Sequence, residues 1–298
     1  MRVKKIRSMA CLLLTSIIWG LAFVAQRAGL EYVSSFTFNG VRFGLGALML
    51  IPVTLLFEHD ADSKPRRRYT FRAGLIGGIV LFLAASLQQF GVEFTESAGK
   101  SGFITGLYVV IVPVLGIFLG RKANMFVWLG AVLACAGLYL LSMRDGFLSL
   151  ELGDAVLLIG ALLWAVHILI VDRFAGGVNP VLFSMVQFFT CSILSLICAF
   201  MFEDVRVASI LAGYVPILYA GCLSVGIAYT LQIFGQRYVE PAKAAIIFSL
   251  ESLFAVLGGA LILGESMDVY GYIGCALIFA GIITSQLRLK RRSASAYR

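Results

Sequence analysis

Long apolar stretches, separated by short polar breaks, make up most of this chain. A helix that crosses a bilayer needs about 20 mostly apolar residues, and these stretches have that length. Backbone groups cannot stay unpaired in hydrocarbon, so each stretch is expected to be helical. The pattern therefore predicts ten membrane-spanning helices, at approximately 9–27, 36–57, 73–91, 101–119, 124–142, 153–173, 179–202, 210–231, 243–263 and 269–287.

The composition indicates that most of the chain is surrounded by lipid. Hydrophobic residues account for 60% of the chain and charged residues for 13%, with a mean hydropathy of +0.94. An ordinary globular domain has about 25% charged residues, so too few are present here to cover a surface in water. We predict an all-α polytopic membrane protein. The six cysteines lie singly within apolar stretches without metal-type spacing, and we interpret them as small buried hydrophobic residues.

Basic residues indicate the orientation of the chain. With the N-terminus in the cytoplasm, all but five of the 24 Lys and Arg residues lie on the cytoplasmic side, as the positive-inside rule requires. The five are Arg27, Arg42, Lys100, Arg144 and Arg206. Both termini are therefore predicted to be cytoplasmic. The basic clusters between spans, such as the predicted loop at 64–68, suit the anionic inner leaflet better than a nucleic acid.

The two halves of the chain resemble each other at a nearly constant offset. Trp19 matches Trp164, 145 residues later, and Glu96 matches Glu240 at an offset of 144. We therefore predict two repeats, residues 1–145 and 146–298. Each repeat holds five spans, and because five is odd, the second repeat enters the membrane inverted. Inverted repeats are typical of secondary transporters, which alternate access to a central site.

Two segments look like motifs of other protein classes. The N-terminus has the basic and apolar parts of a signal peptide, but its span has a counterpart in the second repeat, so we interpret it as a structural helix. Gly99-Lys100-Ser101 resembles the end of a phosphate-binding loop. That loop needs a glycine five positions before Gly99, where this chain has Phe94. The triplet is better interpreted as the entry to the helix at 101–119.

Four segments together resemble EamA-type members of the drug/metabolite transporter superfamily. They are "WG" at 19–20, "VRFGLGAL" at 41–48, "SLESLFAVLGGALILGE" at 249–265 and "GYIGCALIFAGI" at 271–282. The resemblance covers the chain from about Leu12 to Ser285. It implies a transporter of small metabolites in the cell inner membrane, commonly an exporter of amino acids or related compounds.

One segment departs from the family pattern, which commonly reads Leu-Glu-Pro where this chain has Leu250-Glu251-Ser252. A proline removes one backbone hydrogen bond and kinks a helix. Its absence puts a broken helix at 243–263 in doubt. Pro113, by contrast, predicts a kink in the helix at 101–119.

Glu251 is the leading candidate for a functional residue. It lies near the middle of a predicted span, where ionisable residues are costly and usually functional or paired. Apolar surroundings favour the neutral carboxyl, which suits a proton carrier; the alternative is that Glu251 only holds helices together. Its repeat counterpart, Tyr108, shares a helical face with Ser101 and Thr105. Their hydroxyls can orient a polar ligand or join helices.

Five further residues are candidates for the substrate site. Arg42 suits a carboxylate, a phosphate or a buried Glu, although its long side chain also reaches the interface; its repeat counterpart is Gln187. His167, the one histidine in a predicted span, is a candidate proton relay or a helix–helix hydrogen bond. Trp19 and Trp164 lie inside spans rather than at the interfaces, which favours a cavity wall or core packing.

Two pairs of glutamines at the ends of spans are also matched by the repeat, and they are candidates to gate or to cap a cavity. They are Gln88 and Gln89 in the first half, and Gln232 and Gln236 in the second half.

The leading hypothesis is a secondary transporter of a small molecule, with proton coupling through Glu251. The sequence contains no catalytic set, metal-ligating cluster or cofactor motif, so we expect no enzyme activity, no cofactor and no metal. A membrane-embedded lipid-modifying enzyme and a passive channel are the alternatives. The expected partners are the substrate and the lipid bilayer, without nucleic acid, and the sequence leaves monomer and homodimer open.

Overall fold

The computed structural model describes residues 2–57, 64–95, 98–121, 124–142, 151–263 and 269–287. All regular secondary structure in these ranges is helical. The elements are α1 (Arg2–Gly29), α2 (Ser35–Phe57), α3 (Lys64–Thr95), α4 (Ala98–Gly106), α5 (Tyr108–Phe118), α6 (Met125–Ser142), α7 (Leu152–Ala175), α8 (Pro180–Phe202), α9 (Val207–Ala212), α10 (Tyr214–Leu218), the π-helix η2 (Tyr219–Tyr229), α11 (Thr230–Gln236), α12 (Pro241–Phe248), α13 (Leu250–Leu263) and α14 (Val269–Gln286).

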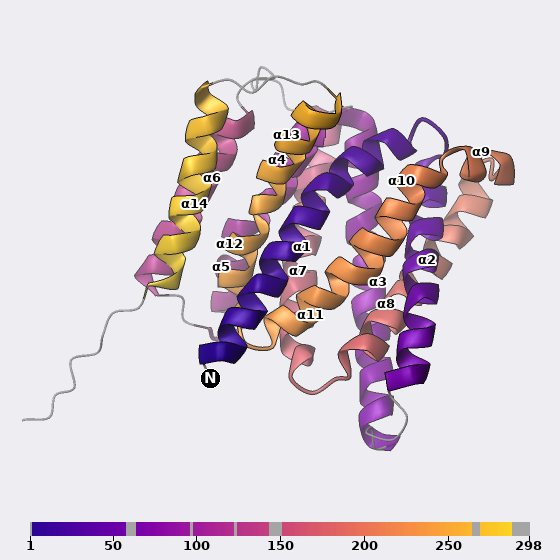
Figure 1. Cartoon of the computed structure of the whole chain (residues 1–298), viewed down its shortest axis with the longest axis horizontal. Coiled ribbons are helices and arrows are strands. Elements are labelled where there is room, and N and C mark those ends of the chain that lie inside the picture. The colour runs from indigo at the N-terminus through magenta and orange to yellow at the C-terminus, as the bar shows by residue number, and fades with distance from the viewer. Residues whose placement is uncertain are drawn as a thin grey trace, which may run out of the picture.

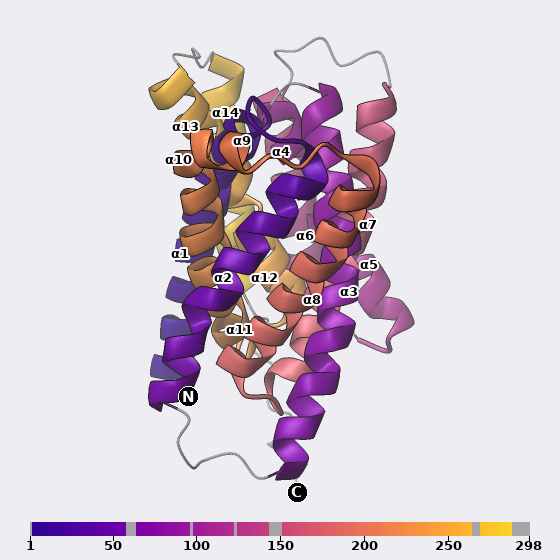
Figure 2. The ribbon, with the colours of Figure 1, turned by 90° about the vertical axis from the view of Figure 1, so that its right-hand side faces the viewer.

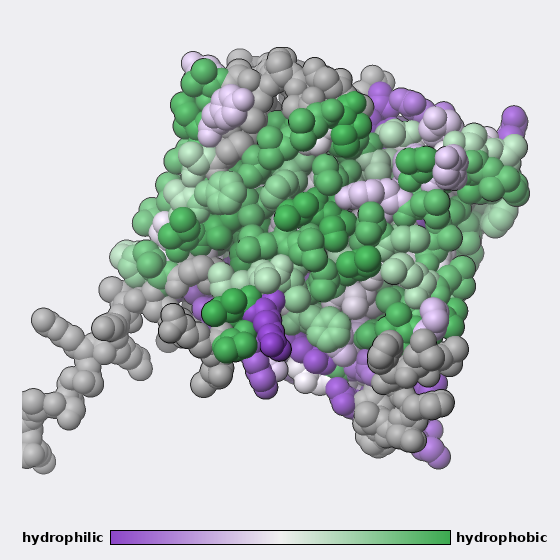
Figure 3. All heavy atoms as spheres, viewed as in Figure 1, coloured by the Kyte–Doolittle hydropathy of each residue, from purple (hydrophilic) through white to green (hydrophobic). Residues whose placement is uncertain are grey.

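The outer surface of the helices is suited to lipid. Eight helical stretches within the described ranges are long and apolar enough to cross a membrane. Two shorter apolar stretches, Met125–Gly137 and Tyr272–Ser285, lie in α6 and α14. Figure 3 shows hydrophobic residues over most of the middle of one face, with hydrophilic residues gathered toward its upper and lower ends. The chain is therefore a multi-pass membrane protein.

Two helices extend beyond the apolar stretches that predicted them. α1 begins at Arg2 and α3 begins at Lys64, so the basic segment at 64–68 is helical and not a loop. Hydropathy detects only the apolar part of a helix. A helix continues past the hydrocarbon without penalty, because its backbone hydrogen bonds are internal. A second basic segment at 288–292, which also suits the anionic inner leaflet by its sequence, lies outside the described residues.

Equivalent contacts join the two halves of the chain. Gly91 of α3 lies so close to α7 that a Cβ on Gly91 would meet Leu157 Cγ at 2.3 Å. The counterparts of these residues in the other half repeat the contact, since a Cβ on Gly235 would meet Leu12 Cδ2 at 2.4 Å. Both pairs depend on glycine to let a leucine approach the helix backbone.

Glycines also allow a close contact between α6 and α14, and this contact too is repeated between equivalent positions. These helices lie side by side, apart from most of the others (Figure 1). A Cβ on Gly137 would lie 2.5 Å from the Gly274 carbonyl oxygen, and a Cβ on Gly281 would lie 2.6 Å from that of Gly130. Gly130 and Gly137 are the repeat counterparts of Gly274 and Gly281. The contact is therefore exchanged between equivalent positions, as a two-fold relation between the halves produces. α2, α8 and α3 form the opposite end of the molecule (Figures 1 and 2).

Two spans are interrupted at equivalent places. α4 and α5 are separated by Leu107, and α12 and α13 by Ser249. Both residues have a ψ near −14°, and Val110 and Ser252 donate backbone hydrogen bonds to carbonyls three residues earlier, which is a tightened 3₁₀ turn. The second interruption occurs although this chain lacks the family proline. The first lies before Pro113, which is inside α5. The interruptions directly precede Tyr108 and Glu251.

Candidate functional site

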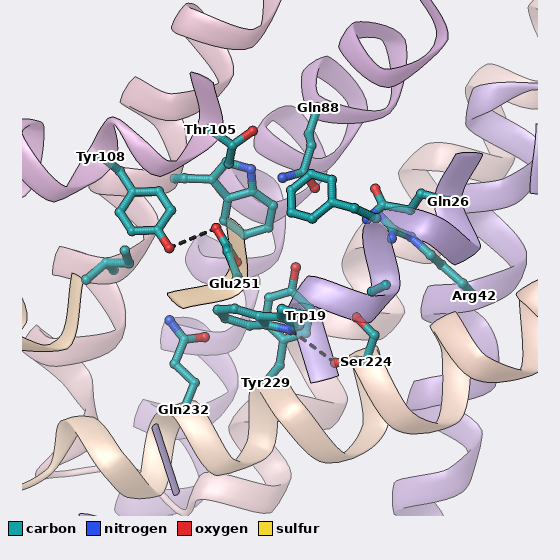
Figure 4. Close-up of a pocket in the computed structure, with 14 residues that line it drawn as sticks. Trp19, Gln26, Arg42, Gln88, Thr105, Tyr108, Ser224, Tyr229, Gln232 and Glu251 are labelled. Atoms are coloured by element: carbon teal, nitrogen blue, oxygen red, sulfur yellow. Dashed lines mark hydrogen bonds between the residues drawn. The ribbon is translucent and has the colours of Figure 1, made fainter. Parts of the chain in front are cut away.

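A polar pocket lies where the interrupted helices meet α1, α2, α3 and α7 (Figure 4). Its free volume is about 30 Å³, and a water molecule needs about 10–15 Å³, so it holds a few waters but no metabolite in this state. The side chains must move apart to admit a larger ligand. The lining residues are Trp19, Ala22, Phe23, Gln26, Arg42, Gln88, Thr105, Tyr108, Trp164, Ile168, Ser224, Tyr229, Gln232 and Glu251.

The two repeat counterparts Tyr108 and Glu251 meet in this pocket. The Tyr108 hydroxyl donates a hydrogen bond of 2.9 Å to Glu251 Oε1 (Figure 4). Both residues are almost fully buried, with 3% and 4% of their surface exposed. Each stands at the beginning of the second half of an interrupted span, α5 or α13. The interruptions thus place a hydroxyl and a carboxyl from the two halves of the chain within direct contact.

Arg42 is buried at another part of the pocket, and no carboxylate in the described part of the chain pairs with it, although the sequence allowed for such a partner. Its guanidinium carbon lies 5.4 Å from the centre of the Phe38 ring and 4.9 Å from that of Phe43, and 2% of the residue is exposed. Within the described ranges, its Nε and Nη2 have no hydrogen-bond partner. A buried charge is costly unless it is paired. The two unpaired nitrogens leave this guanidinium with donors that an acceptor in the pocket could use.

Three aromatic rings form one wall of the pocket. The Trp19 and Tyr229 rings have centroids 4.7 Å apart, and Trp164 stacks on Tyr229 at 6.0 Å. The Trp19 indole N–H donates a hydrogen bond of 3.4 Å to the Ser224 carbonyl, which fixes its ring (Figure 4). Both tryptophans therefore lie at the cavity wall, one of the two positions that the sequence allowed.

Several other lining side chains have polar atoms that no described residue satisfies. They are Gln26 Oε1, Thr105 Oγ1, Trp164 Nε1, and both amide atoms of Gln232. Buried polar groups in proteins are normally paired with protein atoms, water or a ligand. Their concentration around one pocket indicates that it binds water or a polar molecule.

Three predicted site residues lie outside this lining. Ser101 is buried, and its hydroxyl is 2.8 Å from that of Thr95 at the end of α3. His167 Nε2 and Gln187 Oε1 lie 3.1 Å apart, and both residues are fully buried between α7 and α8. Six predicted site residues therefore line the pocket: Glu251, Tyr108, Thr105, Arg42, Trp19 and Trp164. The other three, Ser101, Gln187 and His167, are buried outside its lining.

Sequence reasoning missed Tyr229, Ser224 and Gln26. Tyr229 lies three residues before Gln232, and Gln26 lies seven residues after Trp19, so each shares a helical face with a flagged residue. That helical spacing is the signal from which Tyr229 and Gln26 could have been predicted as lining residues. Of the four glutamines flagged at span ends, Gln88 and Gln232 line the pocket. Gln89 and Gln236 instead donate hydrogen bonds to the carbonyls of Gln26 and Ile168.

The described residues contain no group of three or more His, Cys, Asp or Glu side chains that could hold a metal ion. The lining residues themselves offer one carboxyl, one guanidinium, the phenol hydroxyls of Tyr108 and Tyr229, the hydroxyls of Thr105 and Ser224, amides and aromatic faces. Such a set can bind a polar molecule and hold or release a proton at Glu251.

Known proteins with similar sequences are membrane transporters. The EamA-like transporter family matches this chain twice, over residues 6–143 and 151–286. An "uncharacterized transporter" of Archaeoglobus fulgidus is 29% identical over 96% of this chain and 88% of its own length. The "uncharacterized inner membrane transporter YedA" of Escherichia coli is 23% identical, over 90% and 86%. The "threonine/homoserine exporter RhtA" of Salmonella typhimurium is 24% identical, over 85% and 82%.

A solved crystal structure has the same fold. It superposes with a TM-score of 0.76 over 94% of this chain and 96% of its own, at 17% sequence identity. At this identity the likeness concerns the fold alone.

Proposed function

This chain belongs to the EamA-like transporter family, and we propose that it is a secondary transporter that exports small metabolites across the inner membrane by alternating access. The observation that carries the proposal is the hydrogen bond between Tyr108 and Glu251 in a buried pocket whose other polar atoms are partly unpaired. A protein that only packed its helices would satisfy such atoms internally. A protein that takes up and releases a polar molecule needs them free.

The proposed topology has ten spans, with both termini in the cytoplasm. α6 and α14 supply the two spans beyond the eight long ones, each shorter in its apolar part. Residues 1–145 and 146–298 form the two five-helix repeats, which are inverted relative to each other. The exchanged contacts of Gly91 and Gly235 support this relation. Rocking of one repeat against the other would then open the pocket first to one side and then to the other.

The proposed substrates are amino acids or related compounds. Arg42 offers charged donors for a carboxylate, and Glu251 offers an acceptor for an ammonium group or a proton (Figure 4). The rings of Trp19, Trp164 and Tyr229 would cover the apolar part of the substrate. The name of the Salmonella typhimurium relative, a threonine/homoserine exporter, makes these two amino acids the first compounds to test.

Proton coupling would pass through Glu251. A carboxylate is costly at this depth unless a cation accompanies it, so a proton and a substrate ammonium compete for the same group. Binding of one then favours release of the other. No chemical conversion of the substrate is part of this proposal, and saturable, gradient-dependent flux separates it from a passive channel.

The test is transport by purified protein in liposomes with an imposed pH gradient, using threonine and homoserine as probes. We expect saturable transport that the gradient drives, and loss of gradient-driven transport in Glu251→Gln, which keeps the size of the side chain. Asp204→Asn is the matched control, because Asp204 is an exposed acid paired with Arg206 outside the pocket. If Glu251→Gln transports as well as the wild type under the gradient, the coupling role is wrong. If the wild type only shows non-saturable leakage of both probes, the proposed substrates are wrong.

A further inference from the structure

The lining of the pocket is unequal between the two halves of the chain. Four pairs of repeat counterparts both face it: Trp19 with Trp164, Phe23 with Ile168, Gln88 with Gln232, and Tyr108 with Glu251. Around this shared centre, Ala22, Gln26 and Arg42 also line the pocket, whereas their counterparts His167, Val171 and Gln187 do not. These three lining residues lie toward the side of the molecule where α1 ends and α2 begins (Figure 1). The pocket therefore extends toward one membrane face only.

Arg42 and Gln187 hold equivalent places on opposite sides. Arg42 lies seven residues after the start of α2, and Gln187 lies seven residues after the start of α8. The two helices begin at opposite ends of the molecule and pack against each other (Figure 2). Arg42 reaches the pocket, but Gln187 is enclosed between α3, α7 and α8 with no exposed surface. The structure thus shows one of two equivalent positions open and the other closed.

The closed position contains an incompletely satisfied polar pair. His167 Nε2 and Gln187 Oε1 are within hydrogen-bonding distance at 3.1 Å. His167 Nδ1 and Gln187 Nε2 have no partner anywhere in the described ranges, although both atoms are fully buried. An apolar pair of similar shape would fill this space without unpaired groups. A polar pair at this position makes physical sense if its free atoms meet water or a ligand in another state of the protein.

A single layer of aromatic rings separates this pair from the pocket. The His167 ring lies edge-on to Trp164 at 5.7 Å and to Tyr229 at 6.3 Å between ring centroids. Both of these rings line the pocket on their other side. Tyr229 also contacts Trp19, Phe43 and Phe188, so it is the centre of the aromatic cluster. Movement of the Trp164 and Tyr229 rings would connect the pocket to the His167–Gln187 pair.

We propose that His167 and Gln187 form a second polar binding station, which opens to the cytoplasmic side when the pocket closes around Arg42. The proposal rests on the proposed alternating access and specifies its inward-facing site. In that state the substrate carboxylate would leave Arg42 and meet the imidazole and carboxamide, which offer hydrogen bonds without a fixed charge. The station therefore suits a small zwitterionic metabolite, and the rings of Trp164 and Tyr229 separate it from the pocket in the state described.

Thiol accessibility tests the station without knowledge of the substrate. In a variant whose six native cysteines are replaced by alanine, single cysteines are introduced as Gln187→Cys and Arg42→Cys, and the membrane-impermeant reagent MTSET is added to vesicles of either orientation. Minor conformations are typically populated at about 0.1–10%. We expect Gln187→Cys to react only from the cytoplasmic side, at about that fraction of the rate of the exposed control Arg67→Cys. Arg42→Cys should react only from the outside.

Ser192→Cys is the matched negative control on the same helix. Ser192 is buried and donates a hydrogen bond of 2.7 Å to the Gly40 carbonyl, away from the pocket. It should stay unreactive from both sides. Adding Tyr229→Ala should let Gln187→Cys react from the outside as well, because the ring layer between it and the pocket is then incomplete, and it should leave Ser192→Cys unchanged. Labelling of Gln187→Cys no faster than Ser192→Cys, or from the outside while Tyr229 is present, would overturn the proposal.

A second measurement avoids the cysteine replacements. The chain has two histidines, His59 and His167, so His59→Gln leaves one site for diethyl pyrocarbonate. Mass spectrometry should find slow modification of His167 in this variant and faster modification after Tyr229→Ala. Equal protection of His167 in both variants would contradict the role of Tyr229 in separating His167 from the pocket. These results are independent of the transport assay: absent transport with accessible His167 refutes the proposed substrates, whereas transport with an inaccessible His167 refutes the station.

Discussion

Tyr108 and Glu251 occupy equivalent positions in the two halves of the chain, and their side chains join in a hydrogen bond of 2.9 Å. The contact lies close to the axis that relates the halves, because only there can a residue touch its own counterpart. One half contributes a donor and the other an acidic acceptor. This donor–acceptor pair therefore comes from divergence at one pair of equivalent positions, and it depends on both halves at once.

Tyr108→Phe should slow transport while leaving the fold intact. The change removes only the hydroxyl, and a hydrogen bond to the ionised form of a carboxyl is worth about 1.5–3 kcal/mol. We expect the initial rate in liposomes to fall about tenfold or more. Tyr219→Phe is the control, because the Tyr219 hydroxyl bonds the Ile18 carbonyl outside the pocket lining. A Tyr108→Phe protein as fast as the wild type would show that this hydrogen bond has no role in transport.

Arg42 should determine the affinity for substrates that carry a carboxylate. Arg42→Gln removes the charge, so we expect the concentration for half-maximal transport to rise about tenfold or more. Arg42→Lys keeps the charge without the planar fork and should lie between Arg42→Gln and the wild type. The measurement is a concentration series in liposomes for an amino acid and for its amide. If the amide, which lacks the carboxylate, is affected as strongly as the amino acid, Arg42 does not bind that group.

The same residue should lower the stability of the empty protein. Arg42 is buried with two guanidinium nitrogens that lack a partner in the described structure, which is costly without a ligand. Arg42→Met should therefore unfold at a higher temperature in detergent while it loses transport. Arg206→Met, at an exposed ion pair with Asp204, should change the unfolding temperature little. A lower unfolding temperature in Arg42→Met would mean that the guanidinium stabilises the fold.

Gly281→Ala should separate α6 from α14. Its Cβ would lie 2.6 Å from the Gly130 carbonyl oxygen, and backbone atoms cannot give way as a flexible side chain does. Overpacking of this kind costs about 1–3 kcal/mol. We expect Gly281→Ala to unfold at a lower temperature than the wild type, measured as the loss of the folded peak in size-exclusion chromatography after heating. Gly116→Ala in α5 is the control, since the nearest atom is 3.8 Å away. Equal stability of the two variants would exclude the close crossing.

The ion pair of Arg121 and Asp172 should favour the state described here. It joins the end of α5 to α7 on the side where α1 begins, which is the proposed cytoplasmic side. Partly exposed ion pairs are worth about 0.2–1 kcal/mol, so Asp172→Asn should raise cytoplasmic labelling of Gln187→Cys by no more than about fivefold. The charge exchange Arg121→Asp with Asp172→Arg should restore the original rate. If the exchanged pair does not restore the labelling rate, the effect of Asp172→Asn comes from packing and not from the ion pair.

Three properties could be predicted from the amino-acid sequence: the membrane class, the positions of the apolar spans and the repeat that makes Tyr108 the counterpart of Glu251. These properties are linear: hydropathy over about 20 residues and a constant offset can be read without knowing which helices touch. The depth of Glu251 in its span follows from the same count.

Which residues share a pocket depends on how the helices pack, and the sequence does not contain that packing. In a membrane protein, the lipid-facing and protein-facing sides of a helix are both apolar, so hydropathy does not show which side of a span faces a cavity. The structure placed the unflagged Tyr229 at the centre of the aromatic wall. It also interrupted a span at Ser249 without proline, because a 3₁₀ turn is set by packing as well as by residue type. Finally, Arg42 lines the pocket, whereas its counterpart Gln187 is fully enclosed. A sequence repeat makes the two positions equivalent and cannot show that one faces the pocket and the other does not.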